Sequence, residues 1–245
     1  MSTFTVSLTT AAGRTGRGVR VGVVDSGIHA AHPHVRGIVG GAVIGDEGPT
    51  VGDVIDRLGH GTAVAAAICE KAPDAELLAI KIFDRTLATT GQTLAAAIHW
   101  AAMQHVALIN LSLGTANRHH ESVLTRAISN ARDEEAIVVA AAPEPGVEWL
   151  PGALAGVVGV ELDWACPRDA CVVRLLPDGG VRLAASGYPR PIPGVPPAEN
   201  LKGASFAVAN TTGMLALAIE DCRVRSMAEL IRCLQAIGAD RAAPD

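Results

Sequence analysis

The stretch VRVGVV at Val19–Val24, which leads directly into Asp25-Ser26-Gly27, indicates the fold class of this chain. A short, nearly continuous apolar run that ends at a polar turn is typical of a strand buried on both faces of a sheet. Similar runs follow at Leu77–Ile82, Val106–Leu111, Ile137–Ala142, Val157–Leu162 and Val172–Leu176. Helical patterns lie between or after them, at Gly61–Glu70, Thr93–Gln104, Glu121–Glu134, Ala204–Glu220 and Ser226–Ile237. This alternation predicts a three-layer α/β fold, a parallel sheet with helices on both faces.

The composition supports one folded domain. Of the 245 residues, 49% are hydrophobic but only 3% are aromatic, so a large core must be built from alanine, valine, leucine and isoleucine. Such small side chains suit helices packed closely on a parallel sheet. Because the chain shows neither an internal repeat nor a change of composition, we predict a single domain over residues 1–245, with an N-terminal extension at 1–18.

Charge and hydropathy argue against two classes of partner. The chain has 20 basic and 25 acidic residues, a net charge of −5, and no basic block, so we expect no nucleic acid partner. No apolar run approaches the roughly 18–20 residues that a membrane span needs. The polar residues 1–20 do not have the pattern of a secretory signal, so we expect no membrane partner either.

The cysteines and clustered histidines do not predict a metal site. Five cysteines are scattered along the chain, and we interpret them as reduced thiols of a cytoplasmic protein. Cys166 and Cys171 are five residues apart, but the sequence contains no second pair of cysteines or histidines that would complete a zinc site. His29, His32 and His34 lie close together, but nothing in the sequence completes a coordination pattern. We therefore predict no metal and no cofactor.

A proline-rich segment stands apart from the repeating pattern. Tyr188–Asn200 (YPRPIPGVPPAEN) contains five prolines, which predicts an extended surface loop. The loop lies shortly before Gly203-Ala204-Ser205, so it either borders a substrate cleft or is only a solvated connection.

Polar residues follow the predicted strands at the edge where chemistry collects in an open parallel sheet. Asp25 directly follows the first strand, Ser112 and Gly114 follow the third, and Glu144 follows the fourth. Two further polar residues stand near the start of a predicted helix: His60 between Gly59 and Gly61, and Ser205 two residues after Gly203. Glycine there allows close approach of the backbone and leaves N–H groups free to face an anion.

An acid, an imidazole and a hydroxyl at such junctions are the groups that nucleophilic catalysis needs. A serine hydroxyl attacks a carbonyl only when a base removes its proton, and a carboxylate that fixes the tautomer of the imidazole supports that base. The chain order Asp25, His60, Ser205 is the order known for subtilisin.

Four motifs carry a resemblance to the subtilisin-like serine peptidases, the subtilases. They are VGVVDSGIHAAHP at Val21–Pro33, GHGTAVAAA at Gly59–Ala67, NLSLG at Asn110–Gly114 and GASFA at Gly203–Ala207. The resemblance covers most of the chain, from about Arg20 to Ile219, and implies the single-domain subtilase fold.

The resemblance also implies roles for individual residues. Asp25 would orient His60, His60 would act as general base, and Ser205 would attack the peptide carbonyl. The substrate backbone would pair as an added strand with Ser112, Leu113 and Gly114. Ala141 and Ala142 would line the pocket for the residue before the scissile bond.

The sequence departs from the family at the oxyanion position. Where subtilases have A-A-G-N after the fourth strand, this chain has Ala141-Ala142-Pro143-Glu144, and no asparagine occurs between Asn130 and Asn200. Loss of such a donor typically lowers turnover about 10²–10³-fold. An ionised Glu144 would repel the oxyanion, whereas a protonated one could donate to it.

Two functions of different class therefore remain open. The first is a serine endopeptidase acting on a dedicated peptide or precursor, in which the acyl group could also pass to an amine, as in peptide ligation or cyclisation. The second is a catalytically impaired subtilase that binds a peptide, or a partner enzyme of a peptide-processing pathway, without cleaving it.

Overall fold

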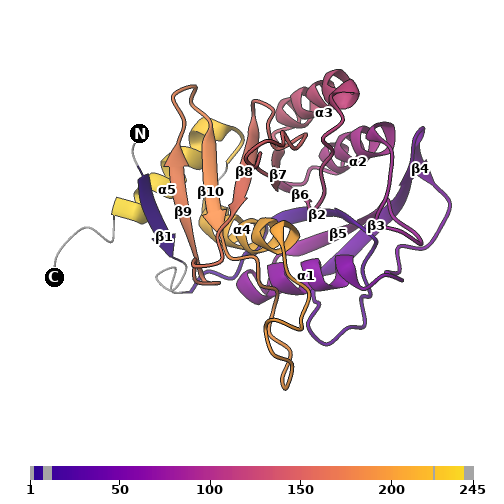
Figure 1. Cartoon of the computed structure of the whole chain (residues 1–245), viewed down its shortest axis with the longest axis horizontal. Coiled ribbons are helices and arrows are strands. Elements are labelled where there is room, and N and C mark those ends of the chain that lie inside the picture. The colour runs from indigo at the N-terminus through magenta and orange to yellow at the C-terminus, as the bar shows by residue number, and fades with distance from the viewer. Residues whose placement is uncertain (1–2, 8–12, 223, 240–245) are drawn as a thin grey trace.

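The computed structural model describes residues 3–7, 13–222 and 224–239 (Figure 1). The strands are β1 (Thr3–Ser7), β2 (Arg20–Asp25), β3 (Ile38–Gly45), β4 (Gly48–Thr50), β5 (Glu76–Lys81), β6 (Leu108–Leu111), β7 (Ile137–Ala141), β8 (Val157–Leu162), β9 (Ala170–Leu175) and β10 (Val181–Ala185). The helices are α1 (His60–Lys71), α2 (Gly91–Met103), α3 (Glu121–Asp133), α4 (Ala204–Ile219) and α5 (Met227–Ala239), with a short 3₁₀ turn, η2 (Arg118–His120), before α3.

The strands form one sheet in the order β1-β9-β10-β8-β7-β6-β2-β5-β3-β4. The seven strands from β10 to β3 are parallel to their neighbours in this order, and antiparallel pairs occur only towards the two ends, at β1–β9, β9–β10 and β3–β4. The predicted α/β fold with a parallel sheet is confirmed. Every strand and helix predicted from the sequence is present, with bounds that agree to within two residues.

Four strands were not predicted, each for a local reason. β3 has the sequence IVGGAVIG, whose glycines and partly exposed side chains weaken the apolar pattern. Gly41 in this strand is required by packing, because a Cβ there would lie 2.2 Å from the Ala79 carbonyl oxygen. β4 has only three residues, and in β10, with the sequence VRLAA, Arg182 interrupts the apolar run. β1 falls within residues 1–18, taken above as an extension, and pairs with β9.

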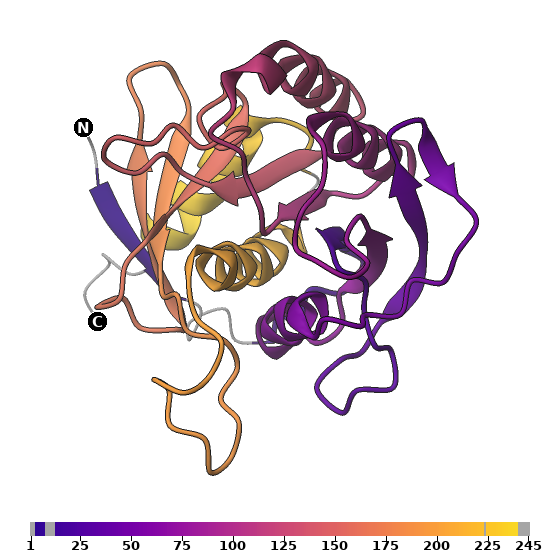
Figure 2. The same ribbon diagram turned by 45° about the vertical axis from the view of Figure 1, so that its right-hand side comes forward.

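Helices cover both faces of the sheet, as the view in Figure 2 shows. One apolar layer lies between the sheet and helices α1, α4 and α5, and the second lies between the sheet and helices α2 and α3. Helix α4 is buried over almost its whole length, which its small, apolar composition allows. Within the described residues, no helix is both long and apolar enough to cross a membrane.

The parallel register brings the predicted site residues to one edge of the sheet. Val24 of β2 lies opposite Leu111 of β6, and Leu111 lies opposite Ala140 of β7. The next residues along the chain are Asp25, Ser112 and Ala141. They therefore lie side by side at the carboxyl ends of three neighbouring strands. Helices α1 and α4 begin near this edge, at His60 and Ala204.

Candidate active site

The carboxylate that ends β2 is hydrogen-bonded to the histidine that begins α1. His60 Nδ1 lies 2.8 Å from Asp25 Oδ1 and 3.0 Å from Asp25 Oδ2. The Asp25 side chain is 1% exposed and that of His60 is 16% exposed. With its proton on Nδ1, His60 donates to Asp25 and keeps Nε2 free to accept a proton.

The surroundings of His60 favour its charged form. Burial lowers the pKa of the imidazole, but the hydrogen bond and charge of Asp25, together with the charge of Asp56, outweigh burial and hold the pKa above its ordinary value. The pair is thus arranged to stabilise the imidazolium that forms when His60 takes a proton.

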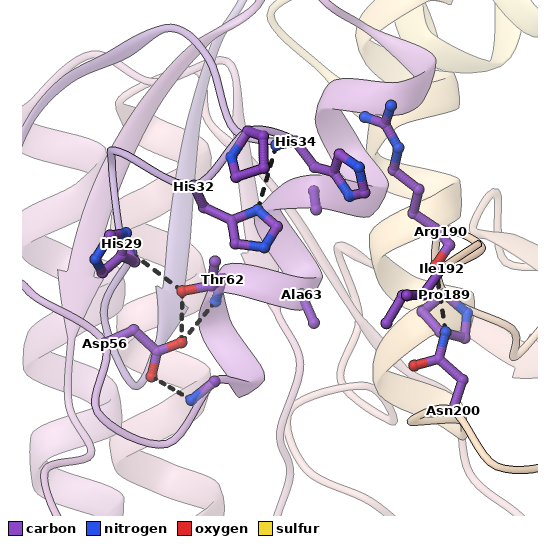
Figure 3. Close-up of a pocket in the computed structure, with 13 residues that line it drawn as sticks. His29, His32, His34, Asp56, Thr62, Ala63, Pro189, Arg190, Ile192 and Asn200 are labelled. Carbon is purple, nitrogen blue, oxygen red and sulfur yellow. Dashed lines mark hydrogen bonds between the residues drawn. The ribbon is translucent and has the colours of Figure 1, made fainter. Parts of the chain in front are cut away.

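A second buried carboxylate, Asp56, fixes the start of α1. It accepts five hydrogen bonds: from the Ser26 hydroxyl, from the backbone N–H groups of Leu58, Gly59 and Thr62, and from the Thr62 hydroxyl. Figure 3 shows its contacts with Thr62. No pattern in the sequence selected Asp56 as a site residue. The one signal was its place in Asp56-Arg57-Leu58-Gly59, immediately before His60.

Ser26 joins the two carboxylates. Its hydroxyl lies 2.8 Å from Asp56 Oδ1 and 3.2 Å from Asp25 Oδ1, and it also accepts the N–H of Gly61 at 3.0 Å. The Ser26 N–H donates to Asp25 Oδ1 at 2.7 Å. Asp25 is therefore held by Ser26, which follows β2, and by His60 of α1. Asp56 is held by Ser26, by the segment just before α1 and by Thr62 of α1.

Ser205 lies in the first turn of α4, after Gly203, whose φ of 140° is a conformation that favours glycine. Its hydroxyl donates to the Ser112 carbonyl oxygen at 3.0 Å. Attack on a substrate with His60 as the base would require this hydroxyl to turn from Ser112 towards His60.

His60 and Ser205 line one cavity of about 280 Å³, which we call the triad cavity. The predicted substrate residues Ser112, Leu113 and Gly114 line it too, as do Ala141 and Glu144. Ala142 does not. It is buried and lines a second cavity of about 520 Å³, which Ala141 and Glu144 also border.

The sequence did not single out the apolar wall of the triad cavity. Phe83, Leu87 and Trp149 contribute to it from segments far apart in the chain. The chain has only three tryptophans and three phenylalanines. This rarity was the one sequence signal that could have drawn attention to Phe83 and Trp149.

Asn110 connects the substrate segment to α4. Its amide donates to the Ser112 hydroxyl at 2.8 Å, and its carbonyl oxygen accepts the Thr212 hydroxyl at 2.9 Å. Asn110 is fully buried, so these bonds fix the end of β6 relative to the helix that carries Ser205.

The model of the subtilase family matches residues 16–145, a span that contains Asp25, His60 and the segment Ser112–Gly114. The chain belongs to the subtilase family. Subtilisin Savinase from Lederbergia lenta is 30% identical to this subtilase over 215 residues, which cover 82% of the chain and 73% of the relative. The chain spans about half the length of most other curated relatives that it matches.

Two solved structures share the fold. Sphericase superposes with a TM-score of 0.66 at 24% identity, over 91% of this chain and 83% of that structure. The crystal structure of a lanthipeptide protease superposes with a TM-score of 0.65 at 20% identity, over 87% of this chain and 78% of that structure.

In this subtilase a tight turn presents Glu144. The backbone N–H groups of Glu144 and Val147 bond to each other's carbonyl oxygens at 3.0 and 2.9 Å, and Pro145 and Gly146 form the corner. The φ of +82° at Gly146 suits a type II turn, in which proline precedes glycine. The Glu144 side chain is exposed and borders both the triad cavity and the second cavity.

Proposed function

We propose that this subtilase is a serine endopeptidase that uses Asp25, His60 and Ser205. The observation that carries the proposal is the buried Asp25–His60 hydrogen bond beside a cavity that His60 and Ser205 both line. The family supports the same activity, since relatives in it are named as proteases.

The chemistry proceeds in two steps. His60 Nε2 takes the Ser205 proton while Ser205 Oγ attacks the substrate carbonyl, and the resulting imidazolium, stabilised by Asp25, gives that proton to the leaving amine. The C–N bond breaks and an ester to Ser205 forms. His60 then removes a proton from water, the hydroxide equivalent attacks the ester, and Ser205 recovers its proton as the acid product leaves.

We propose that Glu144 lowers the turnover rate of this active site. An exposed carboxylate at the position expected for the oxyanion donor offers acceptors where the developing negative charge needs donors. A slow enzyme suits a dedicated peptide substrate better than general protein degradation. The likeness of fold to a lanthipeptide protease agrees with a role in peptide maturation.

An active serine can be tested without knowing the substrate. A fluorophosphonate should add once to the protein, and the adduct should be absent from Ser205→Ala and from His60→Ala. Intact mass gives the readout, and thermal melting shows that both variants are folded. A folded wild-type protein that takes no adduct would contradict the proposal.

A binding protein without turnover is the second candidate, favoured by one observation. The Ser205 hydroxyl donates to the Ser112 carbonyl, and the described structure shows no hydrogen bond between that hydroxyl and His60. In that case Ser112–Gly114 would capture an extended peptide, and wild-type and Ser205→Ala proteins would bind it equally, with no cleavage and no transfer to an amine.

A further inference from the structure

A third cavity, of about 450 Å³, lies between α1 and the proline-rich loop (Figure 3). We call it the histidine–arginine pocket. Its lining includes His32 and His34 from the loop after β2, Ala63 and Ala66 from α1, and Arg190 and Ile192 from the proline-rich loop. The predicted surface loop is therefore one wall of a cavity.

Side chains that can carry positive charge gather at one end of the pocket. The rings of His32 and His34 meet edge to face with centroids 5.3 Å apart, and Figure 3 shows Arg190 reaching towards His34 from the opposite wall. Burial, the charge of Arg190 and the charge of His32 together lower the pKa of His34, against a smaller opposite effect of Glu70. These groups oppose one another's positive charge, and an anion between them would relieve that repulsion.

No acidic side chain in the described structure neutralises Arg190. Its guanidinium makes no ion pair or hydrogen bond with another described residue, although the residue is half-buried. Glu70 is engaged by Arg168 and Lys71. Asp56, which also lines the pocket, already accepts its five hydrogen bonds.

The pocket is built for an anion and not for a cation. Within the described ranges, no three histidine, cysteine or acidic side chains are placed to hold a metal ion. Alanine, proline and isoleucine supply the remaining walls. Apolar walls with an arginine and histidines at one end suit a carboxylate carried on a peptide.

The pocket lies next to the catalytic histidine but outside the triad cavity. Gly59 lines the pocket, whereas the next residue, His60, lines the triad cavity, and the two cavities have no lining residue in common. Ser112, Leu113 and Gly114, which pair with the acyl part of the substrate in the proposed function, line the triad cavity and not the pocket. The pocket is therefore available to the chain beyond the scissile bond.

We propose that the histidine–arginine pocket binds a carboxylate on the leaving-group side of the peptide substrate. The inference rests on the proposed endopeptidase function, and names the substrate class as peptides with an acidic group after the cleaved bond. The carboxylate comes either from an aspartate or glutamate side chain or from the C-terminus of the peptide.

The test uses a random library of acetylated, C-terminally amidated decapeptides and the same library with free C-termini. Products are sequenced by mass spectrometry. With wild-type protein, a side-chain carboxylate predicts about tenfold enrichment of Asp and Glu at one position after the cut in both libraries, in line with a charge-assisted contact. A terminal carboxylate predicts cuts at a fixed distance from the C-terminus in the free library only.

Arg190→Gln should abolish that preference, and Arg190→Glu should replace it with a preference for Lys and Arg. Arg132→Gln is the matched control, because Arg132 is an exposed arginine on α3 that lines neither cavity. All three variants should melt as wild type does and should take the fluorophosphonate adduct. Cleavage without acidic enrichment, or enrichment that survives in Arg190→Gln, would overturn the inference.

A separate binding experiment distinguishes failure of the endopeptidase proposal from failure of the pocket proposal. If the protein cleaves nothing and takes no adduct, the endopeptidase proposal fails, and the pocket is tested by binding. Peptides retained by immobilised Ser205→Ala protein should then be enriched in acidic groups, and those retained by Ser205→Ala/Arg190→Gln should not. Equal composition of the two retained sets would overturn the inference on its own.

Discussion

A single carboxylate oxygen of Asp56 accepts both the backbone N–H and the hydroxyl proton of Thr62, at 2.8 and 2.7 Å. Thr62 lies two residues after His60 in the first turn of α1. The contact therefore fixes the part of the helix that carries the imidazole of the proposed triad, although Asp56 makes no hydrogen bond with that imidazole in the described structure. Asp56 is a positioning residue.

Asp56→Ala should destabilise the protein by about 3 kcal/mol, because it leaves three backbone N–H groups and two hydroxyls without their acceptor. Urea unfolding measures the change, and fluorophosphonate labelling should slow in the same variant. Asp53→Ala is the control. Asp53 is exposed and contacts Arg57, so stability should change little. Equal losses in both variants would contradict the role of Asp56.

Labelling of Ser205 should speed up as pH rises, because His60 acts as a base only when neutral. Since the pKa of His60 is raised, the inflection should lie above the ordinary histidine value of about 6.5. Asp25→Asn removes the charge that raises it, so the inflection should move down and the limiting rate should fall about 10⁴-fold. An inflection unchanged by Asp25→Asn would contradict the coupling of the two residues.

Glu144→Asn should accelerate labelling and cleavage. It replaces exposed acceptors with an amide that can donate to the oxyanion, which predicts a gain of about 10²–10³-fold. Glu144→Ala should gain less, because it removes the negative charge without adding a donor. Single-turnover rates at pH 8 compare the three proteins. A slower Glu144→Asn enzyme would instead identify Glu144 as a donor in the wild type.

Gly61→Ala should disrupt the site and the fold together. A Cβ at Gly61 would lie 2.2 Å from the Gly27 carbonyl oxygen and 3.1 Å from the Cβ of Asp25. Relief of this overlap must move α1 away from β2, so we expect a loss of about 3 kcal/mol and little labelling of Ser205.

Gly45→Ala provides the comparison for that prediction. Its Cβ would meet the end of the Thr50 side chain at 3.3 Å, and neither residue lines the triad cavity, so the change should cost about 1 kcal/mol or less. Thermal and urea unfolding measure both variants. A Gly61→Ala protein with wild-type stability and labelling would show that β2 and α1 can separate freely.

The sequence by itself determined the layered α/β fold and the three residues of the proposed triad. The apolar run VRVGVV and its counterparts indicate buried strands from a few neighbouring residues alone. Gly59 before His60 and Gly203 before Ser205 mark two helix starts. Weak patterns such as the glycine-rich β3 were missed because only the neighbouring strand, through the close approach to Ala79, explains them.

Only the tertiary structure decided how distant segments combine around these residues. Asp56 became part of the site because the loop before α1 folds back onto Ser26 and Thr62, and Ala142 was placed in a different cavity from Ala141. Arg190 and His34 are 156 positions apart in the sequence, and both line one pocket because the proline-rich loop packs across α1. Such contacts form between segments that are far apart in the chain, so they cannot be predicted from the pattern of neighbouring residues.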